Sequence, residues 1–592
     1  MKDFLKFTLA TVVGLIVASV VMFFVSMLVV FGMASSAESE TQVNDNSVMT
    51  LNLNGVVNER SSASTPFDFL LSQADMQSYG LDDILASIKK AKENDKIKGI
   101  YLQCNVISTG WASLQAIRDA LVDFKESGKF IVAYADNYMQ GSYYLASVAD
   151  KVVLNPSGGV DWRGLAAGAT YYKDLLDKLG VEMQVFKVGT YKSAVEPYFT
   201  NEMSEANREQ LTEFVQSIWG NVTKAVAESR HLTVEQLQAA ADSSMLFRPA
   251  EESIQRGLAD TLMYKSDMRN YLKQLMNLEE DDDLHLLDLQ AMINVKKSVP
   301  RDKSGNIIAV YYAEGGIDNN SSSYEETGIN SKKMVKELNK LKENDDVKAV
   351  VLRINSPGGS AFGSEQIWYA LQQLKEKKPV IVSMGDYAAS GGYYIACNAD
   401  TIVAEPTTLT GSIGIFGMIP NMKGLLQDKL GLHNHFVKTN RLADFGDVTR
   451  PMSADEKALM QKNVNHGYDL FLTRCAEGRG MEKERINGIA QGRVWTGEKA
   501  KELGLVDLLG GIDTALEIAI SKADVESYTV MSYPEKSSFI DELLSGNAGN
   551  LLMNTFLKRT KTGRMMQQVN QIEQLTELDP IQARLPFGIS ME

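Results

Sequence analysis

Two patterns of apolar residues alternate through most of the 592-residue chain. Short β-branched runs such as 349–355 (AVVLRIN), 379–384 (PVIVSM) and 401–406 (TIVAEP) end at Gly, Pro or Asn. Between such runs, stretches such as 331–344 and 363–377 carry apolar residues at positions i, i+3, i+4 and i+7. The first pattern is typical of buried strands and the second of amphipathic helices. Their alternation predicts an α/β protein whose largely parallel strands are covered by helices.

The first apolar run is of a different kind, because no residue from Phe7 to Ala37 is charged. Roughly 20 apolar residues cross a bilayer as a helix. We therefore predict one membrane span over about residues 8–33, within an anchor and leader of residues 1–46. Lysines precede the run and acidic residues follow it, so the positive-inside rule places the short N-terminus in the cytoplasm. The rest is expected on the periplasmic side of a bacterial inner membrane, and small residues at 34–37 leave open whether the helix is retained or cleaved.

The body of the chain is an internal duplication. Residues 92–105 match residues 342–355 at 7 of 14 positions, and residues 131–156 match residues 381–406 at 11 of 26, both at an offset of 250. Matches at one offset over so long a span indicate two homologous domains.

These matches divide the chain into four parts after the anchor. We predict a first repeat at 47–278, a linker with an acidic run at 279–305, and a second repeat at 306–534. Residues 535–592 are predicted to be a tail, helical in places, whose role no motif indicates.

Composition argues against several classes of function. Sixty basic and 75 acidic residues give a net charge of −15, which argues against a nucleic-acid-binding surface. Three cysteines do not form a disulfide framework, and five histidines show no zinc-ligand spacing. We therefore expect no metal and no cofactor.

Candidate chemistry appears where strands of the second repeat end. Ser390 lies among small residues just before a predicted helix, where the helix dipole and the Gly391 N–H favour an oxyanion. An N-cap serine is the plain structural alternative. The first repeat has Gln140 at the aligned position but keeps the following Gly and two Tyr. The scaffold therefore persists without the hydroxyl, which favours a catalytic role for Ser390.

A serine nucleophile needs a base, and none of the histidines lies in a recognisable motif. Lys192, among small and apolar neighbours in the first repeat, is the alternative. Lys438 aligns with Lys187, which places Ala443 opposite Lys192. The lysine is thus specific to the first repeat and the serine to the second. The sequence predicts a site where the two repeats meet, either within one chain or between two.

Four motifs occur together and in a fixed order: GTYKSAVEP (189–197), NSPGG (355–359), DYAASGGYY (386–394) and TGSIGI (410–415). In this combination the chain resembles the SppA (protease IV) family of signal peptide peptidases, in its long, duplicated form. The resemblance extends over nearly the whole chain except about the last 55 residues.

The resemblance implies two tandem ClpP/crotonase-like α/β domains after an N-terminal transmembrane helix. It also implies a serine peptidase with an acyl-enzyme mechanism, in which Ser390 is the nucleophile and Lys192 the general base. Gly358 and Gly391 are the implied oxyanion N–H donors, and the role of Ser412 stays open.

The family resemblance further implies substrates and partners. The substrates are cleaved signal peptides and other small or unfolded peptides, and the assembly is a homotetramer shaped as a bowl. Membrane lipid is contacted through the N-terminal helix. Two alternatives remain: a crotonase-type CoA enzyme, which would use a carboxylate and a CoA pocket, and an inactive membrane scaffold.

Overall fold

A computed structural model describes residues 40–61, 77–279, 281–296, 302, 304–319, 328–535 and 581–585, with isolated helical positions between 6 and 22. The predicted membrane span at about 8–33 lies largely outside the described residues. Within the described part, no helix combines the length and apolar character needed to cross a bilayer.

The first repeat is built on a parallel sheet whose strands are buried on both faces. Its hydrogen-bonded order is β2-β1-β3-β4-β5-β7, with β8 also paired to β1. The strands are β1 (Ser47–Asn58), β2 (Gln77–Gly80), β3 (Ile97–Ser108), β4 (Phe130–Tyr138), β5 (Lys151–Val160), β7 (Thr261–Leu262) and β8 (His285–Leu287).

The second repeat carries an equivalent sheet in the order β18-β16-β14-β12-β9-β20, in which β15 pairs with β14 and β19. All of its pairings are parallel except that between β16 and β18. The strands are β9 (Ile307–Glu314), β12 (Val347–Ser356), β14 (Val380–Ala389), β15 (Thr401–Ala404), β16 (Leu409–Gly411), β18 (Val494–Thr496), β19 (Leu508–Leu509) and β20 (Thr529–Tyr533).

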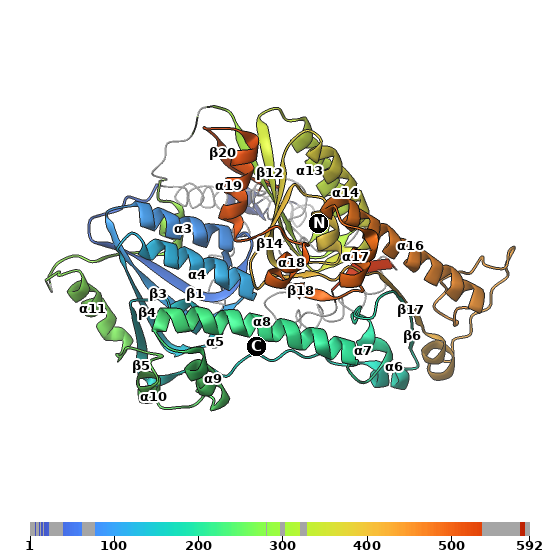
Figure 1. Ribbon diagram of the computed structural model, residues 1–592, viewed down its shortest axis with the longest axis horizontal. Coiled ribbons are helices and arrows are strands. Elements are labelled where there is room, and N and C mark those ends of the chain that lie inside the picture. Colours follow the sequence, from blue (N-terminus) through green and yellow to red (C-terminus); the bar gives the residue numbers. More distant parts are fainter. Residues whose placement is uncertain are drawn as a thin grey trace.

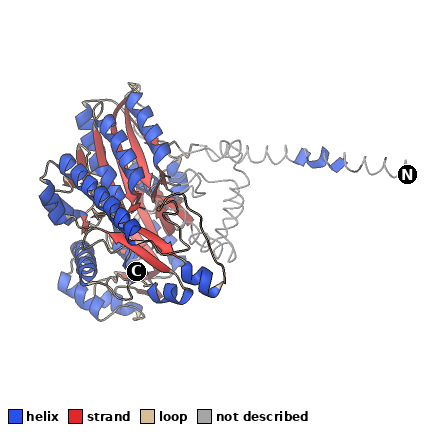
Figure 2. Cartoon of the chain, turned by 90° about the vertical axis from the view of Figure 1, so that its right-hand side faces the viewer, coloured by secondary structure: helices blue, strands red, loops and turns tan. Residues whose placement is uncertain are grey.

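Helices cover both faces of each sheet, as the apolar pattern predicts (Figures 1 and 2). Their bounds in the first half are α3 (Leu81–Glu93), α4 (Trp111–Lys125), α5 (Gln140–Ala146), α6 (Lys173–Leu179), α7 (Glu196–Phe199), α8 (Glu205–Arg230), α9 (Val234–Asp242), α10 (Ala250–Gln255), η1 (Lys265–Asp267), α11 (Met268–Leu275) and α12 (Leu289–Ile293). In the second half they are α13 (Ser331–Glu343), α14 (Ala361–Lys375), α15 (Gly391–Ala396), the π-helix η2 (Gly424–Lys429), α16 (Ala454–Arg479), α17 (Lys483–Ile489), α18 (Gly497–Leu503) and α19 (Ile512–Ala523). The buried core of the first repeat joins α3, α4 and α8 to one sheet face and α11 to the other. In the second repeat, α13, α14 and α16 pack on one sheet face and α19 packs on the other.

The duplication is visible in the element bounds. α3 and α13 begin and end 250 residues apart, as do α4 and α14. Buried contacts are duplicated as well. The Tyr143 hydroxyl donates to the Leu258 carbonyl, and the Tyr393 hydroxyl donates to the Leu505 carbonyl in the same way. Both repeats therefore share one scaffold, and functional differences between them arise from a few side chains and loops.

A third sheet contains strands from both repeats and from the tail. Its order is β11-β10-β13-β21-β17-β6. The strands are β6 (Glu182–Lys187), β10 (Ile317–Asp318), β11 (Ile329–Asn330), β13 (Gly358–Ser360), β17 (Phe416–Asn421) and β21 (Ile581–Arg584). Helix α8 also contacts both repeats and runs across the lower half of the molecule in Figure 1. These elements bring the motifs of the two repeats together.

Two segments add elements to the division expected from sequence. The segment predicted as a linker at 279–305 includes β8 and α12, and Leu287 and Met292 from it are buried in the first repeat's core. Apolar residues are interspersed with the acidic ones in this segment. Through them β8 packs beside β1, and α12 packs against α3. In the predicted tail the structure describes the strand β21, and most of the remaining tail, predicted to be helical in places, lies outside the described residues.

Candidate active site

The side chains of Lys192 and Ser390 meet although they are 198 residues apart in the chain. Nζ of Lys192 lies 2.8 Å from Oγ of Ser390, and both side chains are fully buried at 0% exposure. One residue comes from the first repeat and the other from the second. The contact therefore forms within a single chain, a point that the sequence left open.

Ser390 sits at a sharp junction between β14 and α15. Its backbone has φ 56° and ψ −112°, a region that L-residues rarely occupy and that costs about 1–3 kcal/mol. The N–H of Ser390 donates to the Gly411 carbonyl at 2.8 Å, and its own carbonyl accepts from the Tyr394 N–H. The side chain makes no N-cap hydrogen bond. The helix-cap interpretation of Ser390 is therefore not supported, because its hydroxyl faces Lys192 instead.

Three oxygen atoms surround the amine of Lys192. Besides Ser390 Oγ, they are the Ser412 carbonyl at 3.1 Å and the Ser412 hydroxyl at 3.0 Å. Among the hydrogen bonds described for this amine, none involves a carboxylate. Burial lowers the pKa of Lys192 well below that of an ordinary lysine. The pocket therefore favours the neutral amine, which has two N–H donors and one lone pair.

Close packing against the second repeat fixes the course of the Lys192 segment. The Tyr191 N–H donates to the Gln491 carbonyl at 2.9 Å. A Cβ added to Gly492 would lie 2.6 Å from Lys192 Cβ, and one added to Gly414 would lie 3.2 Å from Lys192 Cδ. A side chain at Gly492 would therefore clash with Lys192, and one at Gly414 would press tightly against the lysine side chain.

Gln210 on α8 ties the lysine segment to the second repeat. Its amide nitrogen donates to the Tyr191 carbonyl at 3.1 Å and to Ser193 Oγ at 2.9 Å. Its amide oxygen accepts from the Val494 N–H at 3.2 Å. One buried side chain thus holds both sides of the contact between the repeats.

The two glycines predicted to bind an oxyanion lie next to each other. A Cβ added to Gly358 would stand 2.6 Å from the Gly391 nitrogen, and Gly358 has φ 94°, a conformation that favours glycine. Gly391 opens α15 directly after Ser390. The Gly358 N–H contacts Ser356 Oγ at 3.2 Å, a long hydrogen bond. The structure brings together all four predicted site residues, Ser390, Lys192, Gly358 and Gly391.

Gln140 takes the place of the serine in the first repeat and holds a loop there. Its amide oxygen accepts from the N–H groups of Arg163 and Gly164, and its amide nitrogen donates to the Gly164 carbonyl. These contacts are structural, since no titratable group is among them.

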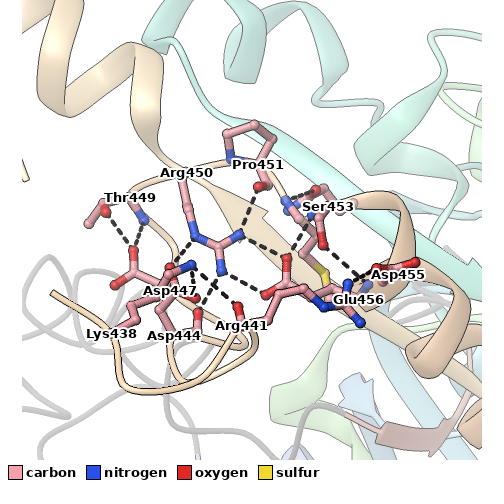
Figure 3. Close-up of polar contacts among 12 residues, drawn as sticks. Lys438, Arg441, Asp444, Asp447, Thr449, Arg450, Pro451, Ser453, Asp455 and Glu456 are labelled. Atoms are coloured by element: carbon pink, nitrogen blue, oxygen red, sulfur yellow. Dashed lines mark hydrogen bonds and ion pairs between the residues drawn. The ribbon is translucent and has the colours of Figure 1, made fainter. Parts of the chain in front are cut away.

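The segment aligned with Lys192 lies in an exposed loop of the second repeat (Figure 3). Ala443 is exposed there, and Lys438 pairs with Asp444 at 2.9 Å. Arg450 joins Asp444 to Glu456 with contacts of 2.8 and 2.7 Å. An ion-pair network therefore shapes the loop where the first repeat has its buried lysine.

Sequence reasoning missed Gln210 and Gly492 and left Ser412 undecided. Ser412 had a signal in the sequence, because it lies in the TGSIGI segment, and in the structure it has φ 49°. Gln210 and Gly492 carry no such signal in the sequence. Each contacts a distant residue of the other repeat, Val494 for Gln210 and Lys192 for Gly492.

Comparisons with known proteins agree with this geometry. The model of peptidase family S49 matches twice, at residues 123–279 and 372–526, and the Clp protease model matches residues 306–407. Protease 4 of Haemophilus influenzae is 33% identical over 576 residues, 95% of this chain and 92% of the relative. Protease 4 of Salmonella typhi is 36% identical over 517 residues, covering 85% and 82%. Serine protease SPPA, chloroplastic, of Arabidopsis thaliana is 30% identical over 551 residues, covering 92% and 78%.

Among solved structures, a ClpP1 mutant from Listeria monocytogenes covers 36% of this chain and 95% of its own length, at 18% identity and a TM-score of 0.24. The sequence left two alternatives open, a crotonase-type CoA enzyme and an inactive scaffold. The matches to a peptidase family favour neither of them. The chain belongs to peptidase family S49, the SppA or protease IV family, and is a serine peptidase built from two tandem ClpP-like α/β domains.

Proposed function

We propose that the protein is a membrane-anchored endopeptidase with a Ser390–Lys192 dyad that degrades cleaved signal peptides and other small or unfolded peptides. One observation carries the proposal: a fully buried lysine amine lies 2.8 Å from a fully buried serine hydroxyl. A buried lysine without a carboxylate partner is costly for stability, which favours a functional reason for its presence.

The first step is proton transfer from Ser390 to Lys192. The two N–H groups of a neutral amine match the carbonyl and hydroxyl of Ser412, which leaves its lone pair facing Ser390 Oγ. Ser390 Oγ attacks the peptide carbonyl while its proton moves to Nζ.

The second step is decay of the tetrahedral intermediate. Its oxyanion is placed against the N–H groups of Gly358 and Gly391, which stabilise the developing charge. The ammonium of Lys192 returns the proton to the leaving amine, and an ester on Ser390 remains. Water, deprotonated by Lys192, then hydrolyses that ester and restores the free serine.

The substrate class follows from the third sheet. β13 carries Gly358, and the position between β13 and β17, which β21 takes in this structure, admits one extended strand paired antiparallel to both. Recognition by strand addition needs an exposed, extended backbone, which small and unfolded peptides offer and folded proteins do not.

Membrane anchoring is proposed from the uncharged stretch at 7–37 and its flanking charges. The catalytic part is then on the periplasmic side. A C-terminal alkaline phosphatase fusion is expected to be active in cells. An inactive phosphatase fusion, together with a fluorescent cytoplasmic reporter, would show the opposite topology.

A ring-like assembly, a tetramer by family resemblance, is supported by the duplication itself. β17 of the second repeat pairs with β6 of the first. The offset of 250 assigns a reciprocal pair, residues near 166–171 with residues near 432–437. In the part of the chain that the structure describes, neither of these segments belongs to a strand.

We propose that a neighbouring copy supplies this reciprocal partner. Leu432, Phe436 and Val437 are exposed apolar residues in one of the two segments, which suits an interface. Sedimentation of the wild type is expected to give an oligomer, and Val437→Asp is expected to shift it toward smaller species. An active monomeric wild type would contradict the ring.

The activity is tested with casein and a signal-peptide-like substrate. Ser390→Ala and Lys192→Ala are expected to leave less than about 1% of activity, since each removes one half of the dyad. Gln140→Ala, the aligned change in the first repeat, is expected to retain activity. Substantial hydrolysis by Ser390→Ala would remove this serine as the nucleophile.

A further inference from the structure

The strand β21, from near the end of the sequence, fills the gap between β13 and β17. Gly358 pairs with Arg584 and Ser360 with Gln582 on one side, and Phe416 pairs with Gln582 on the other, both antiparallel. The Leu585 N–H also donates to the Pro357 carbonyl at 2.7 Å. The chain therefore places its own backbone where an extended substrate would bind.

The strand also lies against the two glycines assigned to the oxyanion. The Ala583 carbonyl oxygen lies 2.1 Å from the position of a Cβ added to Gly358 and 3.1 Å from that of one added to Gly391. A peptide carbonyl thus lies against the pair of glycines assigned to the oxyanion. Ala583 is fully buried, as are Ser390 and Lys192. No second strand fits there while β21 is in place.

We propose that β21 is a built-in competitor of peptide substrates, which must leave the gap before a substrate can bind. The proposal rests on the proposed function, because it takes the gap between β13 and β17 as the substrate site. A bound strand lowers the apparent affinity for substrate by the fraction of molecules in which the gap is open. Tethering raises the effective concentration of such a competitor without further contacts.

The strand is suited to reversible binding. It contributes only four residues to the sheet, and Arg584 among them is exposed. Its two buried side chains from the ladder, Gln582 and Ala583, are small or polar. The main sheet of each repeat is complete without β21, although Ala583 packs into the core of the second repeat and Leu585, the residue after the strand, into that of the first.

The test measures binding without catalysis. In a Ser390→Ala background, a fluorescent signal-peptide-like peptide is titrated by anisotropy into the full chain and into the same chain lacking residues 581–585. The deletion is expected to tighten binding by about tenfold or more. Deletion of residues 561–565, the same length upstream, is the matched control and is expected to leave the affinity unchanged. Equal affinities for the full chain and the 581–585 deletion would overturn the proposal.

A point variant guards against a folding defect in the deletion. Ala583→Asp places a carboxylate in a fully buried position and is expected to release the strand. Its affinity for the fluorescent peptide should then rise as much as in the deletion. Arg584→Ala, at the exposed neighbour, is the control and is expected to bind the peptide like the full chain. Unchanged affinity in Ala583→Asp together with an unchanged thermal midpoint would count against the proposal.

A free peptide with the sequence of residues 580–586 is expected to displace the fluorescent peptide from the deletion variant. Failure of the proposed function appears separately, as absent hydrolysis by chains with Ser390 intact. Failure of the competitor appears as equal peptide binding, with or without hydrolysis.

Discussion

At the scale of single residues, the charge state of Lys192 is set by what surrounds its amine. Desolvation favours the neutral form, and the two oxygens of Ser412 accept its N–H bonds. In the proposed mechanism, Ser412 therefore positions the base.

Ser412→Ala is expected to lower kcat by about tenfold to a hundredfold with little change in KM, because the amine loses one of the two acceptors that orient it. Thermal unfolding is expected to change little. Ser142→Ala, at a buried serine of the first repeat with one hydrogen bond of its own, is the matched control. A kcat equal to wild type in Ser412→Ala would show that the Ser412 carbonyl alone orients the lysine.

A substitution at Gly492 tests whether the Lys192 side chain needs the free space beside it. Gly492→Ala adds a methyl group 2.6 Å from Lys192 Cβ and forces alanine to φ 79°. We expect more than tenfold loss of activity and a stability loss of about 1–3 kcal/mol. Gly480→Ala has a similar positive φ with open space around it, so it is expected to lose some stability and no activity. Equal activity in the two variants would contradict the packing argument.

At the scale of elements, buried polar contacts hold the two repeats in register. Arg353 on β12 makes a two-pronged contact with Glu59, which follows β1, at 2.8 and 3.1 Å. Both side chains are buried. The Asp386 carboxylate, just before Ser390, accepts from the N–H and hydroxyl of Ser113 in the first repeat. The strand that leads into Ser390 is therefore anchored to the other repeat.

Arg353→Met is expected to lower the free energy of unfolding by about 3–5 kcal/mol, because it leaves the Glu59 carboxylate buried without its partner. Adding Glu59→Leu is expected to recover part of that loss. Lys340→Met, which breaks the exposed pair with Glu337, is expected to change stability by less than about 1 kcal/mol. Thermal unfolding monitored by circular dichroism measures all three. A loss for Arg353→Met no larger than for Lys340→Met would show that the pair adds nothing to the repeat interface.

At the scale of the whole molecule, the proposed Ser390–Lys192 site forms where the two repeats meet. Self-comparison of the sequence predicted the duplication, the α/β class, and the assignment of Lys192 and Ser390 to different repeats. These features leave local signals, in the motifs and in residues such as Gln140 and Ala443 that break the repeat. The sequence did not predict β8 in the linker, Gln210 at the interface, or β21 beside Gly358. Each depends on pairing between distant segments, and nothing in the local pattern specifies the partner.

Dependence on both repeats can be tested with separate halves. Residues 306–592 carry Ser390, Gly358 and Gly391 but lack Lys192, so alone they are expected to be inactive. Adding residues 47–300 is expected to restore some activity, whereas the same fragment with Lys192→Ala is expected to restore none. Activity of residues 306–592 by themselves would show that another residue is the base.

The central claim, that Lys192 activates Ser390 as a neutral base, is tested most directly by covalent labelling as a function of pH. A fluorophosphonate is reacted with the wild type, Lys192→Met and Lys192→Arg, and the labelled residue is identified by mass spectrometry. We predict one label per chain, on Ser390. Its rate should rise with pH through the lowered pKa of Lys192 and level off below about 10.4, the pKa of a free lysine. Both variants should react at least about a hundredfold more slowly, because methionine is no base and arginine stays protonated. Labelling at another residue, or equal rates in wild type and Lys192→Met, would contradict the dyad.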